Sequence, residues 1–149
     1  MSVRQYIDDF LYVKRFSVFY WKDYEFQDGS GSRDKFIITL NCEANEFPLT
    51  IILPTSNERG SYYSNAENLV DCVLIDIGES EFFTYQDKKT IIDLKNILFE
   101  DKEFILAAHN LNELTFKGIV EVNLQNRIKT AITNSITLDE YEIDKLLCV

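Results

Sequence analysis

The chain has 149 residues, of which 46% are hydrophobic and 27% are charged, and it contains 11 Phe and 8 Tyr. This composition is typical of one globular domain with a hydrophobic core, and it argues against a disordered chain. No apolar run approaches the ~20 residues that a membrane helix needs, and the N-terminus lacks the layout of a secretory signal. We therefore expect a single domain over residues 1–149 that is soluble and cytoplasmic and has no membrane partner.

The net charge of −10 disfavours non-specific attraction to nucleic acid or to an anionic membrane. Such binding depends on Lys and Arg side chains that displace counterions from phosphates. Residues 1–60 carry seven basic and nine acidic side chains, which gives −2, whereas residues 61–149 carry eight and sixteen, which gives −8. The first 60 residues are therefore the better place for a polyanion, and the acidic remainder is equally suited to a basic protein partner.

The three cysteines, Cys42, Cys72 and Cys148, are widely spaced, and no Cys-x-x-Cys motif is present. With a single histidine, His109, the chain lacks the ligand set of a zinc site. We expect buried free thiols in a reducing compartment, and neither a metal nor a cofactor. His109 is expected at the end of a strand or turn.

The first half of the chain predicts one helix followed by strands. Apolar residues recur at helical spacing after Ser2, which is a good N-cap, and β-branched and aromatic residues dominate the later segments. The expected elements are a helix over 3–14 and strands over 16–22, 35–42 and 49–53, the last ended by Pro54.

The second half predicts shorter strands and then helices. Residues 55–68 are polar and read as a long loop, and strands follow over 70–77, 82–85 and 90–94. An apolar stripe predicts a helix over 118–133, and the capping-box pattern of Thr137–Glu140 predicts a final helix through Leu147. The expected fold class is α+β, with five or six strands in a mostly antiparallel sheet or small barrel flanked by helices.

A loop rich in glycine and serine, Asp28–Lys35, lies between the first two predicted strands. It holds Arg33 and Lys35 beside a sheet, and such a loop is suited to hold a phosphate. A mobile hairpin connection is the plainer interpretation of the same residues.

The order of these features resembles the MazF/PemK-like toxin family over about residues 16–56. The resemblance rests on a strand that contains Trp21, a Gly/Ser loop that ends in a basic residue, and the segments 35–41 and 49–56. It implies a small antiparallel SH3-like β-barrel with an N-terminal helix and C-terminal helices, assembled as a homodimer. It further implies a toxin–antitoxin protein that cuts single-stranded RNA without a metal and whose site is covered by an antitoxin.

By this resemblance, Arg33 and Thr55 act on the scissile phosphate. Cleavage through the ribose 2′-hydroxyl needs a group that stabilises the charge of the phosphorane, and a guanidinium suits that role. Arg33 is followed by Asp34, where the family usually has Pro, and a carboxylate there competes for the guanidinium and repels phosphate. The plainer interpretation of Thr55 is an ordinary residue at a strand end.

Four further residues are candidates for RNA contacts. Ser56 offers a hydroxyl to a phosphate oxygen, Lys35 and Lys22 add positive charge, and Trp21 offers a ring on which a base can stack. A Trp that alternates between core and surface positions of a strand is the plainer interpretation of Trp21.

A second class of function stays open, that of a non-enzymatic acidic binding module. An immunity protein or antitoxin-like inhibitor that covers a basic partner protein would carry a strong negative charge, as this chain does. A basic concave strip through Lys22, Arg33 and Lys35 would favour RNA, and an all-negative surface would favour a basic protein partner.

Overall fold

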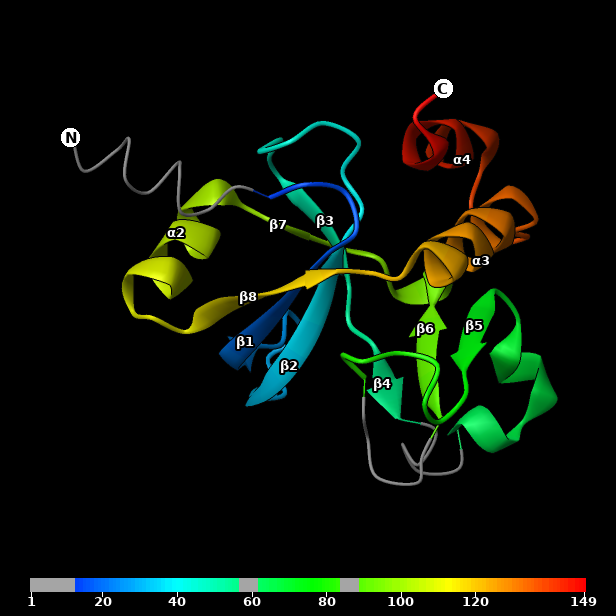
Figure 1. The fold of residues 1–149 in the computed structure, drawn as a ribbon, viewed down its shortest axis with the longest axis horizontal. Helices are drawn as coiled ribbons and strands as arrows, with labels where there is room; N and C mark the ends of the chain where they lie inside the picture. The colour runs from blue at the N-terminus through cyan, green and yellow to red at the C-terminus, as the bar shows by residue number, and fades with distance from the viewer. Residues whose placement is uncertain (1–12, 57–61, 84–88) are drawn as a thin grey trace.

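The computed structural model (Figure 1) describes three stretches of the chain, residues 13–56, 62–83 and 89–149. The helix expected over 3–14 lies outside the described residues except for Val13 and Lys14, which are not helical. The described part is α+β, as the sequence predicts. No helix within it is long and apolar enough to cross a bilayer.

An antiparallel sheet of five strands forms the first layer of the fold. Its order is β7-β3-β2-β1-β8, and every pairing is antiparallel. The strands are β1 (Ser17–Glu25), β2 (Ser32–Thr39), β3 (Leu49–Ile52), β7 (Leu98–Glu100) and β8 (Leu114–Ile119).

A smaller sheet lies beside the first and contains three antiparallel strands in the order β4-β6-β5. Its strands are β4 (Thr55–Ser56), β5 (Cys72–Ile75) and β6 (Thr90–Asp93). Short 3-10 helices adjoin it, namely η1 (Tyr62–Ser64), η2 (Ala66–Leu69) and η3 (Leu94–Asn96). The described helices of α type are α2 (Lys102–Asn110), α3 (Val122–Thr133) and α4 (Glu140–Leu147).

The central strands of the five-stranded sheet are covered on both faces, which explains the nearly continuous apolar runs in the first part of β1, the second part of β2 and all of β3. On one face, Phe19 and Trp21 of β1 pack with Ile105 of α2. On the other, Val18 of β1 packs with the smaller sheet and with α3, including Ile128. Figure 1 shows α2 on one side of β1 and β2 and the pair of α3 and β6 on the other.

The small barrel that the resemblance implies is wrong, whereas the alternative expectation of a mostly antiparallel sheet is confirmed. The five-stranded sheet stays open, with β7 and β8 as its two edges, and the remaining strands form a separate sheet. A sheet that has apolar side chains on both faces buries them by covering both faces with other elements, and here these are α2 on one side and α3 with the smaller sheet on the other.

Five predicted strands are confirmed within a few residues of their ends, as β1, β2, β3, β5 and β6. The strand expected over 82–85 is wrong where it is described, because Phe82 lies in a bend and Phe83, which is buried in the core, has no regular secondary structure. The rest of that segment lies outside the described residues. The loop expected over 55–68 contains β4, η1 and η2.

The helical last third of the chain is confirmed in type but not in its starting points. The predicted helix 118–133 begins at Val122, because Gly118 and Ile119 still belong to β8. The expected position of His109 at the end of a strand or loop turn is wrong. His109 lies in the last helical turn of α2 and is 7% exposed. Three elements, β7, α2 and β8, were not predicted from the sequence.

The final helix is α4, and its capping box differs from the predicted one. Asp139 is the N-cap and its side chain accepts a hydrogen bond from the backbone of Glu142, whose side chain in turn accepts from the backbone of Asp139. The pattern Thr137–Glu140 therefore predicted the helix correctly but placed its N-cap at Thr137 instead of Asp139. The apolar residues Ile143, Leu146 and Leu147 face the core.

The prediction of three free thiols is wrong for two of them. Cys42, in the connection between β2 and β3, forms a disulfide with Cys148, the C-cap of α4, and only Cys72 is free among the cysteines. The two partners are 106 residues apart in sequence and 5.7 Å apart between Cα atoms. Tertiary packing brings them together, so their spacing in the chain held no sign of the pairing.

Candidate functional site

The structure places the predicted catalytic residues in two different sheets. Arg33 lies exposed on β2 of the five-stranded sheet, and Thr55 lies on β4 of the smaller sheet, opposite Ile91. Ser56 continues β4 opposite Thr90. The loop before Arg33 is a hairpin turn between β1 and β2, as expected.

The charge of the β1–β2 hairpin is mixed rather than basic. Three basic residues stand against four acidic ones over residues 22–35, namely Lys22, Arg33 and Lys35 against Asp23, Glu25, Asp28 and Asp34. The balance of −1 gives phosphate no electrostatic attraction, since binding to phosphate depends on an excess of Lys and Arg.

Asp34 does not engage Arg33 in the way the sequence suggests. Its carboxylate accepts hydrogen bonds from the backbone of Asp23 and from the hydroxyl of Tyr20, each at 2.9 Å. These two bonds, in that order, lower the pKa of Asp34. Within the described residues, no ion pair joins Arg33 to Asp34, so the guanidinium is exposed beside a carboxylate that is already occupied.

Trp21 is a core residue. It is 1% exposed, its ring meets Tyr24 edge-on at 5.0 Å between centroids, and Phe104 lies 5.4 Å from it. An RNA base needs a free ring face for stacking. The burial of Trp21 therefore supports its plainer interpretation and removes it from the candidate RNA contacts.

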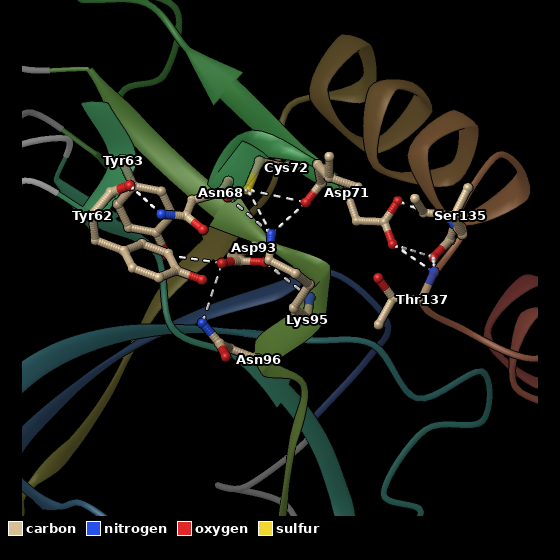
Figure 2. A network of polar contacts seen from close by, with 12 residues as sticks. Tyr62, Tyr63, Asn68, Asp71, Cys72, Asp93, Lys95, Asn96, Ser135 and Thr137 are labelled. Carbon is tan, nitrogen blue, oxygen red and sulfur yellow. Dashed lines mark hydrogen bonds and ion pairs between the residues drawn. The ribbon is translucent and has the colours of Figure 1, made fainter. Parts of the chain in front are cut away.

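A polar cluster around the buried carboxylate of Asp93, shown in Figure 2, joins η1, β5 and η3. Asp93 is 3% exposed and accepts hydrogen bonds from Tyr63 at 2.9 Å and Asn96 at 3.3 Å. The ammonium of Lys95 lies 2.9 Å from the same carboxylate. Tyr63 comes from η1, and Lys95 and Asn96 come from η3, so the carboxylate at the end of β6 ties these two segments together.

The chemistry of this cluster is that of an anchor rather than of a reaction centre. Burial opposes the charge of Lys95, but the hydrogen bond and charge of Asp93 outweigh it and raise the pKa of Lys95. Burial, followed by the charge of Asp93, raises the pKa of Cys72 to about 11. At neutral pH the lysine is therefore protonated and the cysteine is a thiol, and neither form is a nucleophile.

A groove of about 400 Å³ lies between α4 and the side of the five-stranded sheet that ends in β7. Ile97 and Phe99 line it from the sheet edge, Leu40 from the end of β2, and Tyr141 and Leu146 from α4. Phe99 is 55% exposed and Tyr141 is 74% exposed. Two large aromatic side chains, one from β7 and one from α4, are thus presented to solvent in one hollow.

The charged side chains around this groove are mostly acidic. Glu43 and Glu46 come from the β2–β3 connection and Glu142 from the first turn of α4, and all three are exposed. Lys145 is the single basic side chain among the lining residues. An apolar hollow with a charged rim is the form that binding grooves take, and the acidic rim selects for a cationic occupant.

The Cys42–Cys148 disulfide is part of the groove wall and lies beside a cation. Nη1 of Arg15 lies 2.8 Å from Cys148 Sγ, and Nη2 donates to the backbone carbonyl of Leu146. Arg15 therefore sits at the C-terminal end of α4, where its charge complements the helix dipole. The ring of Phe16 packs under the guanidinium at 4.9 Å.

No family model matches this chain. No curated protein matches it either, and no solved structure does. The function must therefore be argued from the chain's own residues. Among those that the structure describes, no group of three or more His, Cys, Asp or Glu side chains could hold a metal ion.

The groove as a whole has no signature in the sequence, because its parts come from three distant segments near residues 40, 98 and 144. One signal was present in α4, where Tyr141 lies off the inward stripe of Ile143, Leu146 and Leu147. An aromatic residue off the apolar stripe of an amphipathic helix indicates a contact outside the core.

Proposed function

We propose that this protein is a non-enzymatic binding module that holds a basic segment of a partner protein in the groove beside α4. The observation that carries the proposal is the pairing of two exposed aromatic side chains, Phe99 and Tyr141, with a rim of three glutamates. The net charge of −10 also supports a basic partner, because a negatively charged protein attracts a cationic one.

The dimensions of the groove fit one anchor side chain and its flanking residues. Pockets that bind ligands typically enclose roughly 300–1,000 Å³, and this one lies within that range. An apolar or aromatic anchor of the partner would pack between Phe99 and Tyr141, while flanking Lys or Arg side chains pair with Glu43 and Glu46. The buried anchor supplies most of the affinity, and the rim charges supply specificity and association rate.

The test is the affinity of the full chain for a synthetic peptide with one Phe flanked by four Lys residues, measured by isothermal titration calorimetry. Two variant peptides, one with Glu in place of Lys and one with Gly in place of Phe, separate the charge from the anchor. We expect binding of the first peptide alone, and a loss of about tenfold or more in Phe99→Ala.

A matched control is available on another surface. Phe116 of β8 is 52% exposed, close to the value for Phe99, and lies outside the groove. Phe116→Ala is expected to bind the peptide as the wild type does. Equal losses in the Phe99 and Phe116 variants, or no binding of the basic peptide by the wild type, would refute the proposal.

A second candidate is the RNA cleavage that the MazF/PemK resemblance implies, with a homodimer and an antitoxin as partners. The exposed guanidinium of Arg33, left unpaired by Asp34 within the described residues, favours it. Its test is cleavage of a long mixed-sequence RNA in EDTA by the wild type and by Arg33→Ala. Sequence-selective cutting that the variant lacks would support the nuclease, and the absence of both cutting and RNA retention at low salt would refute it.

A further inference from the structure

We propose that the Cys42–Cys148 disulfide is a redox-exchange site and that its reduction by a dithiol opens the groove beside α4. Because the same groove is concerned, this control rests on the proposed function. The bond lies in the groove wall and joins the β2–β3 connection to the C-cap of α4. The connection carries Glu43 and Glu46, and the helix α4 carries Tyr141. It is thus a covalent link between α4 and the connection whose glutamates pair with the occupant.

The remaining attachments of α4 are few. The helix has eight residues, and helices shorter than roughly 12 residues are marginal without tertiary contacts. Leu146 is its one buried residue, at 8% exposure, and Ile143 and Leu147 pack partly buried beside it. Arg15 holds its C-terminal end through the carbonyl of Leu146. Without the disulfide, α4 therefore opens more readily than the rest of the fold.

The surroundings of the bond suit thiol exchange. Cys148 is exposed and Cys42 is half-buried, so an external thiolate can reach the bond. The Arg15 guanidinium lies 2.8 Å from Cys148 Sγ and stabilises negative charge there. A sulfur beside a cation is the better leaving group in exchange, and this directs the attack to Cys42 Sγ.

The exchange balances with a dithiol as the reductant. One thiolate of the dithiol attacks Cys42 Sγ, the bond to Cys148 breaks, and its electron pair leaves on Cys148 Sγ. The second thiol of the reductant then attacks the reductant's own sulfur in the mixed disulfide and closes a cyclic disulfide, which releases Cys42. The protein gains two electrons and two protons, and the dithiol loses the same number.

The third cysteine serves as an internal control. Cys72 lies in the polar cluster of Figure 2, away from the groove lining, and its pKa is raised to about 11 by burial and by Asp93. It therefore stays a thiol at neutral pH and takes no part in the exchange. Cys72→Ser is expected to respond to a reductant as the wild type does.

The test has one readout that does not depend on any ligand. Amide hydrogen exchange of α4 is measured with and without dithiothreitol in the wild type, in Cys72→Ser and in the double variant Cys42→Ser/Cys148→Ser. We expect exchange in α4 to rise about tenfold or more on reduction in the first two proteins, and to be fast in the double variant with or without reductant. Trp21 is the only tryptophan and is buried, so its fluorescence reports whether the rest of the fold stays intact.

The second readout is the affinity for the Phe/Lys peptide, which we expect to fall about tenfold or more on reduction. Unchanged exchange in α4 after reduction would overturn the redox control even if the peptide still binds. Exposure of Trp21 on reduction would overturn it as well, because the whole fold would then have opened. Faster exchange in α4 in a protein that binds no peptide when oxidised would support the opening while refuting the proposed function.

Discussion

The hydroxyl of Tyr24 donates a 2.6 Å hydrogen bond to Oε1 of Glu100, and both side chains are buried. Tyr24 comes from β1 and Glu100 from the edge strand β7, so the bond spans the five-stranded sheet from one strand to another that does not pair with it. Gln27 donates to the same oxygen at 2.8 Å. This carboxylate therefore links the β1–β2 hairpin to the strand that forms the groove edge.

The first prediction concerns the loss of this hydroxyl. Tyr24→Phe keeps the ring but leaves the buried Glu100 with Gln27 as its remaining donor, and we expect a loss of about 1–3 kcal/mol in the free energy of unfolding. Urea unfolding followed by Trp21 fluorescence measures it. Tyr141→Phe, on an exposed tyrosine, is the control and is expected to change stability by less than about 0.5 kcal/mol. An equal loss in both variants would contradict the assignment.

The second prediction concerns alkaline pH. Burial, followed by the hydrogen bond and charge of Glu100, raises the pKa of Tyr24. A raised pKa favours the protonated phenol in the folded state, so its contribution to stability is present below the unfolded value near 10 and is lost as the pH rises above it. The stability difference between wild type and Tyr24→Phe should therefore shrink above about pH 10. A constant difference from pH 8 to pH 11 would argue against a titrating Tyr24.

Local patterns in the sequence were enough to predict the β1–β2 hairpin and the last helix. Phe19 and Trp21 alternate with residues that face the opposite layer, and a Gly/Ser turn separates the two strands. α4 was predicted from a polar N-cap before an apolar stripe, even though the cap itself was shifted to Asp139. These signals lie within a few residues of one another, so they can be recognised from the sequence alone.

The features that escaped prediction depend on distant residues. Strand β7 has three residues and becomes a strand because it pairs with β3, about 50 positions earlier in the chain. The pairing of Cys42 with Cys148 and the placement of Phe99 and Tyr141 in one groove likewise follow from how the layers stack. Residue type and spacing carry no information about such contacts, so neither the disulfide nor the groove could be predicted.

The third prediction concerns salt. If the rim glutamates attract a basic occupant, the affinity for the Phe/Lys peptide should fall as salt screens them, since the Debye length shortens from about 10 Å at 0.1 M to about 3 Å at 1 M. The double variant Glu43→Gln/Glu46→Gln should bind more weakly at low salt and show a flatter salt dependence. Calorimetric titrations at about 0.05, 0.15 and 0.5 M NaCl, which span strong to weak screening, measure the salt dependence of the affinity. A salt dependence that the variant shares with the wild type would place the charge contacts elsewhere.

The fourth prediction concerns Asp71, which joins the end of η2 to the α3–α4 connection (Figure 2). Its carboxylate accepts from the hydroxyl of Ser135 at 2.7 Å and from the backbone of Thr137 at 2.9 Å. Burial opposes its ionisation, but the hydrogen bonds from Thr137 and Ser135 outweigh burial and lower the pKa of Asp71. Asp71→Asn is therefore expected to lose about 1–2 kcal/mol of stability at pH 7.

The pH dependence of that loss provides its check. A lowered pKa means that the contribution of Asp71 is present above its unfolded value near 3.9 and disappears as the pH falls through the folded value. The wild type and Asp71→Asn should thus converge below about pH 4 in urea unfolding. Curves that stay parallel down to pH 3 would show that shape rather than charge makes Asp71 important.

The last prediction isolates a close contact at Gly118 in β8. This residue has a φ of +146°, and a Cβ built on it would lie 2.8 Å from Cζ of Phe82. Gly31, in the β1–β2 turn, has a φ of +124° with nothing within 4 Å of such a Cβ, so it has the backbone strain without the clash. We expect Gly31→Ala to lose about 1 kcal/mol of stability and Gly118→Ala about 2–4 kcal/mol, because the second variant must also displace the Phe82 ring. Both are measured by urea unfolding, and equal losses would show that the Phe82 ring yields to the added methyl group at no cost.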